Sequence, residues 1–139
     1  MPEVLLDRAL TAGAEHVPAL VLAAGEAAAR AGLAPERALH LELAVEEAAV
    51  NICTHAYHGA PGPLRLRVLA AGEDVRVELT DEGPAYSPLE EAPPDLSAGL
   101  AERPIGGLGV HLMRQVTDEL HYERRGERNI LTLIFRRRD

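Results

Sequence analysis

The sequence predicts a two-layer α/β sandwich, in which helices cover one face of a sheet and the other face meets water. Residues 16–31 and 35–57 are rich in alanine, leucine and glutamate, the composition of amphipathic helices. Residues 64–68 and 75–80 alternate apolar with charged side chains, as strands do when one face is buried. The polar positions of these strands form a face that no helix is expected to cover: Arg65, Arg67, Arg76 and Glu78.

The N-terminal half is predicted to hold one strand and two helices. Residues 3–10 form a short first strand, and the helix over residues 16–31 ends at Gly32. The second helix starts near Pro35, where a missing N–H costs little, and runs to Tyr57. The spacing of its large apolar residues predicts a broad apolar face: Leu39, Leu41, Leu43, Val45, Val50, Ile52 and Tyr57.

The C-terminal half is predicted to hold a hairpin, a long loop, a helix and two further strands. The hairpin turns at Gly72. Residues 82–105 have no regular period and contain half of the 10 prolines, which is typical of a lid or binding loop. The remaining elements are one helix and two strands: residues 108–117, 119–124 and 129–136. Since the sequence contains no internal repeat and no sign of a second domain, we expect one domain over residues 1–139.

Composition excludes several classes of protein. The chain has 139 residues and a net charge of −8, and all 14 basic residues are arginine. A Walker A loop and a protein-kinase fold each need a lysine, so neither is present. The negative charge argues against direct binding to DNA or RNA. The single cysteine fits a reducing compartment, and no apolar run approaches the ~20 residues of a membrane span, so we expect a cytoplasmic protein.

The first candidate site lies on the second predicted helix. Glu47, Asn51 and His55 are spaced four residues apart, so they form one polar stripe. A carboxylate and an amide oxygen one turn apart suit a hard cation such as magnesium. An ordinary solvated helix face is one alternative. A transition-metal site that uses His55 and His58 is another, although the chain has no HExxH pattern and too few cysteines for a zinc ribbon.

The second candidate site follows the second strand of the hairpin. Residues 75–79 place valine and leucine on the inner side at every second position, so Asp81 is expected to point inward as well. A buried carboxylate needs donors, which come either from the protein or from a ligand amino group such as that of adenine. Gly83 would let the backbone approach such a base closely. The alternative is an aspartate that simply starts a turn.

The third candidate site is the run Gly106-Gly107-Leu108-Gly109, which opens the third predicted helix. Glycines at a helix N-terminus expose backbone N–H groups that can bind phosphates. Glycine-rich turns before helices are also common as purely structural features. No GxGxxG pattern follows a strand, so a Rossmann fold is excluded.

The order of these three signals resembles the GHKL ATP-binding fold, the Bergerat or histidine-kinase-like ATPase fold shared by sensor histidine kinases, gyrase and MutL. The local sequence is similar to that of anti-sigma-factor serine/threonine kinases of the RsbW/SpoIIAB type. Residues 41–57 resemble the N box of that family, residues 81–86 its G1 box and residues 106–109 its G2 box. The resemblance covers residues 5–136 and implies a mixed, mostly antiparallel sheet with helices packed on one face.

The resemblance implies a role for each matching residue. Asn51 would be the magnesium ligand, and Glu47 the general base that orients the attacking hydroxyl. Asp81 would accept a hydrogen bond from the adenine amino group, with Gly83 beside the base. Arg103, just before the G2 box, would contact the phosphates in place of a lysine. The other implied nucleotide-binding residues lie in the G1 and G2 boxes: Ala85, Gly107, Leu108 and Gly109.

The function implied by the resemblance is that of a protein serine/threonine kinase that uses ATP and Mg²⁺ and is also an anti-sigma factor. It would bind a sigma factor in one state and phosphorylate a STAS-type anti-anti-sigma protein in another. No direct contact with nucleic acid or membrane is expected. Relatives are often dimers, so a homodimer is one option for this chain, but nothing in the sequence fixes the oligomeric state. The alternative is a nucleotide-responsive binding module of the same fold with little or no kinase activity.

Overall fold

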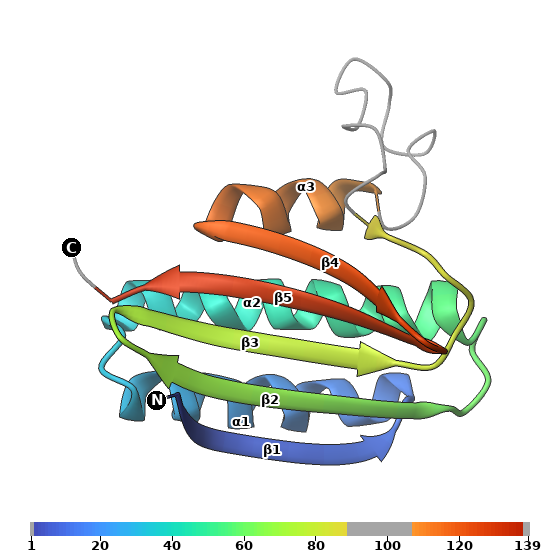
Figure 1. The fold of residues 1–139 in the computed structure, drawn as a ribbon, viewed down its shortest axis with the longest axis horizontal. Helices are drawn as coiled ribbons and strands as arrows, with labels where there is room; N and C mark the ends of the chain where they lie inside the picture. Colours follow the sequence, from blue (N-terminus) through green and yellow to red (C-terminus); the bar gives the residue numbers. More distant parts are fainter. Residues whose placement is uncertain (1, 89–106, 138–139) are drawn as a thin grey trace.

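The computed structural model describes residues 2–88 and 107–137, with the backbone alone for residues 107–111. The described chain is an α+β sandwich, in which a five-stranded sheet carries helices on one face (Figure 1). The helices are α1 (Val17–Arg30), α2 (Pro35–Asn51) and α3 (Gly107–Val116), with a 3₁₀ turn η1 (Ala14–His16) and a π-helical turn η2 (Ile52–Ala56). The strands are β1 (Glu3–Thr11), β2 (Pro63–Ala71), β3 (Asp74–Asp81), β4 (Glu119–Arg125) and β5 (Arg128–Arg136). None of the described helices is both long and apolar enough to span a membrane.

The sheet has the strand order β1-β2-β3-β5-β4, so the last strand of the chain lies between β3 and β4. All four pairings between the described strands are antiparallel, where the sequence predicted a mixed, mostly antiparallel sheet. The β4–β5 hairpin turns at Gly126, whose φ of 61° favours glycine. Because β3 and β5 are neighbours, Asp81 at the end of β3 faces Asn129 near the start of β5.

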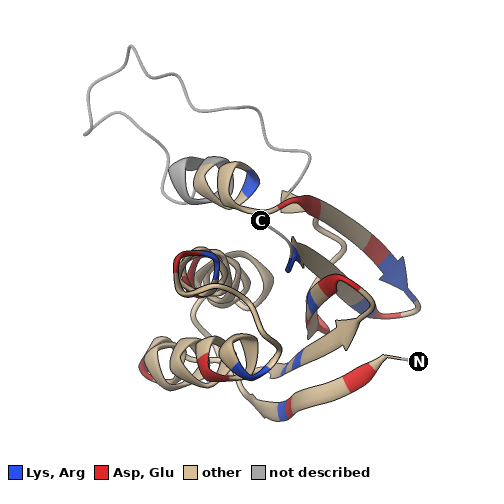
Figure 2. Ribbon diagram, turned by 90° about the vertical axis from the view of Figure 1, so that its left-hand side faces the viewer, with Lys and Arg blue, Asp and Glu red and all other residues tan. Residues whose placement is uncertain are grey.

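The two faces of the sheet differ as the strand pattern predicts. The inward side chains of β3 and β5 include four that are fully buried: Val75, Val77, Leu133 and Phe135. On the open face, Arg67 Nη1 lies 3.0 Å from Glu78 Oε1, and Arg65 Nη2 lies 2.6 Å from Asp7 Oδ2. Viewed from the side, the helices form one layer and the sheet the other (Figure 2). The predicted two-layer sandwich is therefore confirmed.

The predicted second helix is confirmed as α2 followed by η2, but its buried face is narrower than predicted. Leu41 and Val45 are fully buried, whereas Leu39 and Val50 are 55% and 42% exposed. Three alanines, each at most 1% exposed, complete the inner face: Ala44, Ala48 and Ala49. Because these small side chains fill the inner positions, the larger Leu39 and Val50 lie on the opposite side of the helix, in water.

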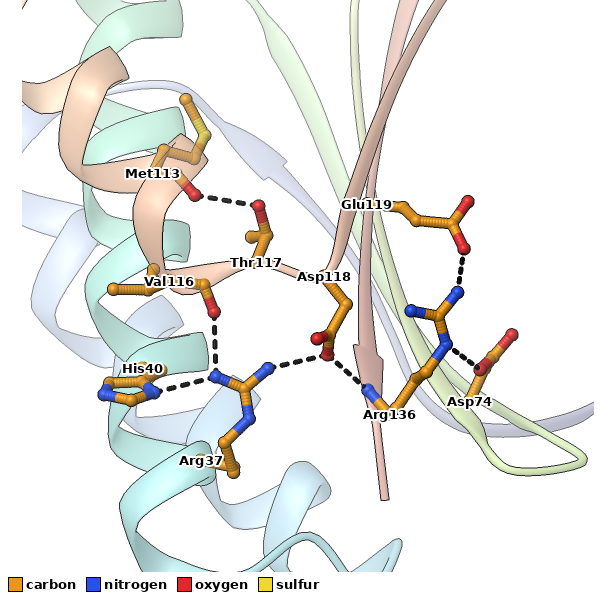
Figure 3. Close-up of polar contacts among 9 residues, drawn as sticks. All are labelled: Arg37, His40, Asp74, Met113, Val116, Thr117, Asp118, Glu119 and Arg136. Carbon is orange, nitrogen blue, oxygen red and sulfur yellow. Dashed lines mark hydrogen bonds and ion pairs between the residues drawn. The ribbon is translucent and has the colours of Figure 1, made fainter. Parts of the chain in front are cut away.

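Arg37, near the start of α2, fixes the C-terminal end of α3 (Figure 3). Its guanidinium donates to the Val116 carbonyl oxygen at 2.9 Å and to Asp118 Oδ2 at 2.7 Å, and lies 5.3 Å from the centroid of the Phe135 ring. Asp118 Oδ2 also accepts the Arg136 backbone N–H at 2.8 Å. Partial burial raises the pKa of Asp118, but this hydrogen bond and the Arg37 charge together lower it below its usual value. The end of α3 opposite the predicted phosphate-binding glycines is thus tied to α2 and β5.

Candidate functional site

A small hollow opens where α2 and η2 meet the ends of β3 and β5. Asn51 and Asp81 both line it, so the first two candidate sites come together in space although they are far apart in the sequence. The other lining residues are mostly apolar or aromatic: Ala48, Ile52, Ala56, Tyr86, Pro88, Tyr122, Asn129 and Leu131. A concave site with an apolar lining and a few polar groups is what small-molecule pockets have in common.

Asp81 is 5% exposed, in agreement with the inward position that strand alternation predicted. Its Oδ1 accepts the Gly83 backbone N–H at 2.9 Å and the Asn129 Nδ2 at 2.9 Å. Within residues 2–88 and 107–137, no group donates to its Oδ2. The described residues therefore hold one carboxylate oxygen, and the other is placed to accept a hydrogen bond from a ligand in the hollow.

Asn129 organises the polar side of the hollow, although it is not among the site residues predicted from the sequence. Its side chain is almost fully buried. Nδ2 donates to Asp81 Oδ1 and to the Pro84 carbonyl oxygen, both at 2.9 Å, and Oδ1 accepts the Tyr122 hydroxyl at 2.5 Å. Both ends of the amide are used, so the side chain cannot turn without losing bonds. A signal existed, because Asn129 has the parity of the buried Leu131 and asparagine is depleted in strands.

The loop after β3 is tied to both sides of the hollow. Arg124 Nη1 of β4 donates to the Gly83 carbonyl oxygen at 2.7 Å, and the Glu82 backbone N–H donates to the Tyr57 hydroxyl at 2.8 Å. A Cβ at Gly83 would lie 2.6 Å from the Cβ of Ala56 and 2.8 Å from its carbonyl oxygen. The close approach that requires glycine is therefore to the end of η2. Contact between Gly83 and a base stays a prediction.

Asn51, the last residue of α2, has a buried side-chain oxygen without a hydrogen-bond partner in the described part of the chain. An unpaired buried acceptor costs about 1–3 kcal/mol, so a ligand that occupies it is favoured. An amide oxygen suits Mg²⁺, which takes few protein ligands and completes its shell with water and phosphate oxygens. The described residues contain no group of three histidine, cysteine, aspartate or glutamate side chains able to hold a metal on their own. Asn51 thus fits the magnesium ion predicted for it.

The helix changes from α to π geometry directly after Asn51, at η2. Such π turns are frequent at functional sites. His55, within η2, stacks on Tyr86 with the ring centroids 5.2 Å apart and the planes 25° from parallel. Because Tyr86 lines the hollow, this stack supports part of its wall. His55 Nε2 is buried and makes no hydrogen bond to the described residues.

Glu47 lies one helical turn before Asn51 and is half-buried, but it is not among the described residues that line the hollow. Burial raises the pKa of its carboxyl group, and the neighbouring charge of Glu46 raises it further. A carboxylate with a raised pKa is a stronger base, as general-base catalysis near neutral pH requires. Its part in catalysis stays a prediction.

The structure says less about the remaining predicted site residues, which lie in the G1 and G2 boxes and in the predicted lid. Ala85 is exposed on the loop after β3 and does not line the hollow. Gly107, Leu108 and Gly109 form the first turn of α3, where backbone N–H groups lack helical partners. Arg103 lies outside the described residues, as does the part of the predicted lid after Pro88.

Comparison with known proteins assigns the family. Residues 10–135 match the model of the histidine kinase-like ATPase domain. The chain therefore belongs to the histidine kinase-like ATPase family, which uses ATP. This confirms the resemblance drawn from the three boxes.

Within that family, the chain is similar to kinases and anti-sigma factors. It is 36% identical to the serine/threonine-protein kinase BtrW of Bordetella bronchiseptica, over 67% of this chain and 66% of that protein. It is 30% identical to the anti-sigma F factor of a Thermoanaerobacter species, over 63% and 62% respectively, and 28% identical to the serine-protein kinase RsbW of Bacillus pumilus, over 86% and 78%. The match thus spans just under two thirds of the length of the first two relatives.

Among solved structures, the histidine kinase AdeS of Acinetobacter baumannii has a similar fold. The TM-score is 0.52 and the sequence identity 17%, over 95% of this chain and 68% of that chain. At this identity the likeness bears on the fold alone, and it confirms the predicted α+β class with helices on one face of the sheet.

Proposed function

We propose that this chain is an ATP-dependent protein serine/threonine kinase that also acts as an anti-sigma factor. The observation that carries ATP binding is the half-satisfied carboxylate of Asp81, which the described part of the chain holds through Oδ1 alone. The exocyclic amine of adenine would donate to Oδ2. Guanine carries a carbonyl oxygen at the same ring position, which offers Oδ2 no donor, so the site favours adenine.

The phosphates would lie between the start of α3 and the end of α2. Backbone N–H groups of the first turn of α3, which begins at Gly107 and includes Leu108 and Gly109, attract negative charge. Arg103 would add a positive charge in a chain without lysine. Asn51 Oδ1 would hold a magnesium ion, which neutralises phosphate charge when it is bound.

Glu47 would act as the general base of the transfer. The hydroxyl of an acceptor serine or threonine gives its proton to the Glu47 carboxylate while its oxygen forms a bond to the γ-phosphorus. The bond between the γ-phosphorus and the bridging oxygen breaks, and ADP leaves. The raised pKa of Glu47 supports this role, because a stronger base takes the proton more readily.

The relatives support the choice of partners. Their names, anti-sigma F factor and serine-protein kinase, describe proteins that act on a sigma factor and on a serine of a protein. We extend both properties to this chain, with a STAS-type anti-anti-sigma protein as the substrate and with action as a homodimer in the cytoplasm. Phosphorylation of the STAS protein would end its interaction with the kinase and leave the sigma factor bound.

Transfer of radiolabel from the γ-phosphate of ATP to purified STAS-domain proteins of the same genome tests the kinase. The wild type is expected to label one of them on serine or threonine in the presence of magnesium. Glu47→Gln is expected to bind ATP and to transfer no label. No transfer by the wild type at saturating ATP and magnesium would refute the kinase activity.

A nucleotide-responsive binding module without catalysis is the second candidate. One observation favours it: among the described residues, Glu47 does not line the hollow that holds Asn51 and Asp81. In this case ATP would control sigma-factor binding without phosphoryl transfer. Full control of sigma-factor binding by ATP in the Glu47→Gln variant would support the module, and loss of that control would support the kinase.

A further inference from the structure

One side of α2 presents a row of large apolar side chains to solvent, on the side of the helix opposite its buried face. Leu39 is 55% exposed, Val50 is 42% exposed and Leu43 is half-buried. Four and seven residues separate these positions, so the three side chains, here called the α2 outer row, lie along one line of the helix. Single exposed leucines are ordinary on protein surfaces, whereas several large apolar side chains aligned on the solvent side of one helix are typical of an interaction site.

Acidic side chains border the α2 outer row. Glu36 and Glu46 lie on the same side of the helix and are exposed. The one arginine of α2, Arg37, is engaged by Asp118 and by the carbonyl oxygen of Val116. Acidic segments also colour the side of α1 and α2 that faces away from the sheet (Figure 2). This surface therefore combines apolar contact with a negative rim.

The α2 outer row runs past the proposed catalytic base. Leu43 precedes Glu47 by four residues and Val50 follows it by three, so both are its neighbours on the helix surface. None of the three residues of the row lines the hollow formed around Asn51 and Asp81. A protein that docks on the row would therefore lie beside Glu47 without displacing a nucleotide from the hollow.

We propose that the α2 outer row is the docking site for the protein that carries the acceptor hydroxyl, and that this protein presents an apolar segment flanked by arginine or lysine. The proposal rests on the kinase activity proposed above. A second copy of this chain is disfavoured, because it would bring Glu36 and Glu46 against like charges. The chain's own residues 89–106 are disfavoured for the same reason, since their sequence contains four acidic residues and one basic residue.

The test measures binding of a fluorescein-labelled amphipathic peptide, with leucine along one face and arginine on both flanks, to the full chain by anisotropy. A matched peptide with glutamate in place of arginine is expected to bind at least about tenfold more weakly. Leu39→Ser combined with Val50→Ser should weaken binding of the basic peptide by about tenfold or more, since both apolar anchors are lost. Glu46→Arg should weaken it and reduce its salt dependence.

Leu22→Ser is the matched control, because Leu22 is 60% exposed on α1 and lies outside the row. It should leave peptide binding unchanged, and all variants should bind ATP as the wild type does. With a STAS protein that the wild type phosphorylates, the double variant should raise KM about tenfold and change kcat by less than about twofold.

Equal binding of the two peptides would show that the partner is not basic. Binding of the basic peptide by the double variant as tightly as by the wild type would show that the α2 outer row is not the binding site. The transfer of labelled phosphate distinguishes failure of the docking site from failure of the proposed kinase activity. If the wild type and the double variant label a STAS protein equally well, the chain is a kinase but the α2 outer row is not the docking site. If the chain binds the basic peptide on the row but transfers no phosphate, it is not a kinase, and the protein that docks on the row is not a phosphate acceptor.

Discussion

Replacement of Asn129 by alanine tests how the protein holds the carboxylate proposed to bind adenine. The change removes the Nδ2 donor to Asp81 Oδ1, at 2.9 Å, and the acceptor of the Tyr122 hydroxyl, at 2.5 Å. A hydrogen bond to a charged group contributes about 1.5–3 kcal/mol and a neutral one about 0.5–1.5 kcal/mol. We therefore expect Asn129→Ala to lower the free energy of unfolding by roughly 3 kcal/mol. For a chain of this size, that corresponds to a fall in Tm of about 10 °C.

Urea denaturation followed by circular dichroism measures this loss, and calorimetric titration measures ATP binding by the same variant. ATP should bind about tenfold more weakly, because the carboxylate is no longer held in one orientation. Thr132→Ala, on the open face of the same strand, is the control and should lower stability by no more than about 1 kcal/mol, the loss expected for a β-branched residue in a strand. An Asn129→Ala variant as stable as this control would show that Asn129 does not hold Asp81.

Three further substitutions test the Gly83–Ala56 contact, the role of Glu47 and the contacts of Asp118. Gly83→Ala should destabilise the fold by about 1–3 kcal/mol, because the new Cβ would meet Ala56 at 2.6 Å; an unchanged urea midpoint would contradict this contact. Glu47→Gln should abolish label transfer and keep ATP binding. Because the folded-state pKa of Glu47 is raised, the stability of the wild type relative to this variant should fall as pH rises from about 4.3 through the raised value. A difference in Tm between the two that does not change with pH would argue against a raised pKa. Asp118→Asn should lower the free energy of unfolding at neutral pH. Since the pKa of Asp118 is lowered in the folded state, the difference in stability between wild type and variant should vanish as pH falls through that lowered value. A difference that persists in acid would show that the charge contacts with Arg37 are not its source.

Local periodicity was sufficient to predict most of the elements. Alternation along β3 placed Asp81 on the buried side before any contact was known, and the structure bears this out at 5% exposure. The break between the two predicted strands, residues 119–124 and 129–136, coincides with the turn at Gly126. These features depend on neighbours within a few residues, which is the range over which side-chain period and turn chemistry act.

The features missed from the sequence depend on partners far along the chain. Asn129 holds Asp81 only because β5 inserts beside β3, and no local pattern reports that pairing. The exposure of Leu39 and Val50 was missed because α2 is apolar on more than one side. Which side is buried depends on how closely alanines let α1 and the sheet approach, a property of tertiary packing that periodicity alone does not reveal.

Asp81 and Asn51 are proposed to form a site for ATP with magnesium. Calorimetric titration of ATP into the wild type and into the Asp81→Asn variant is the decisive experiment for this site. We expect the wild type to bind ATP, its affinity to fall strongly when magnesium is removed, and the folded Asp81→Asn variant not to bind. No binding by the wild type, or equal binding by the variant, would contradict the proposed site.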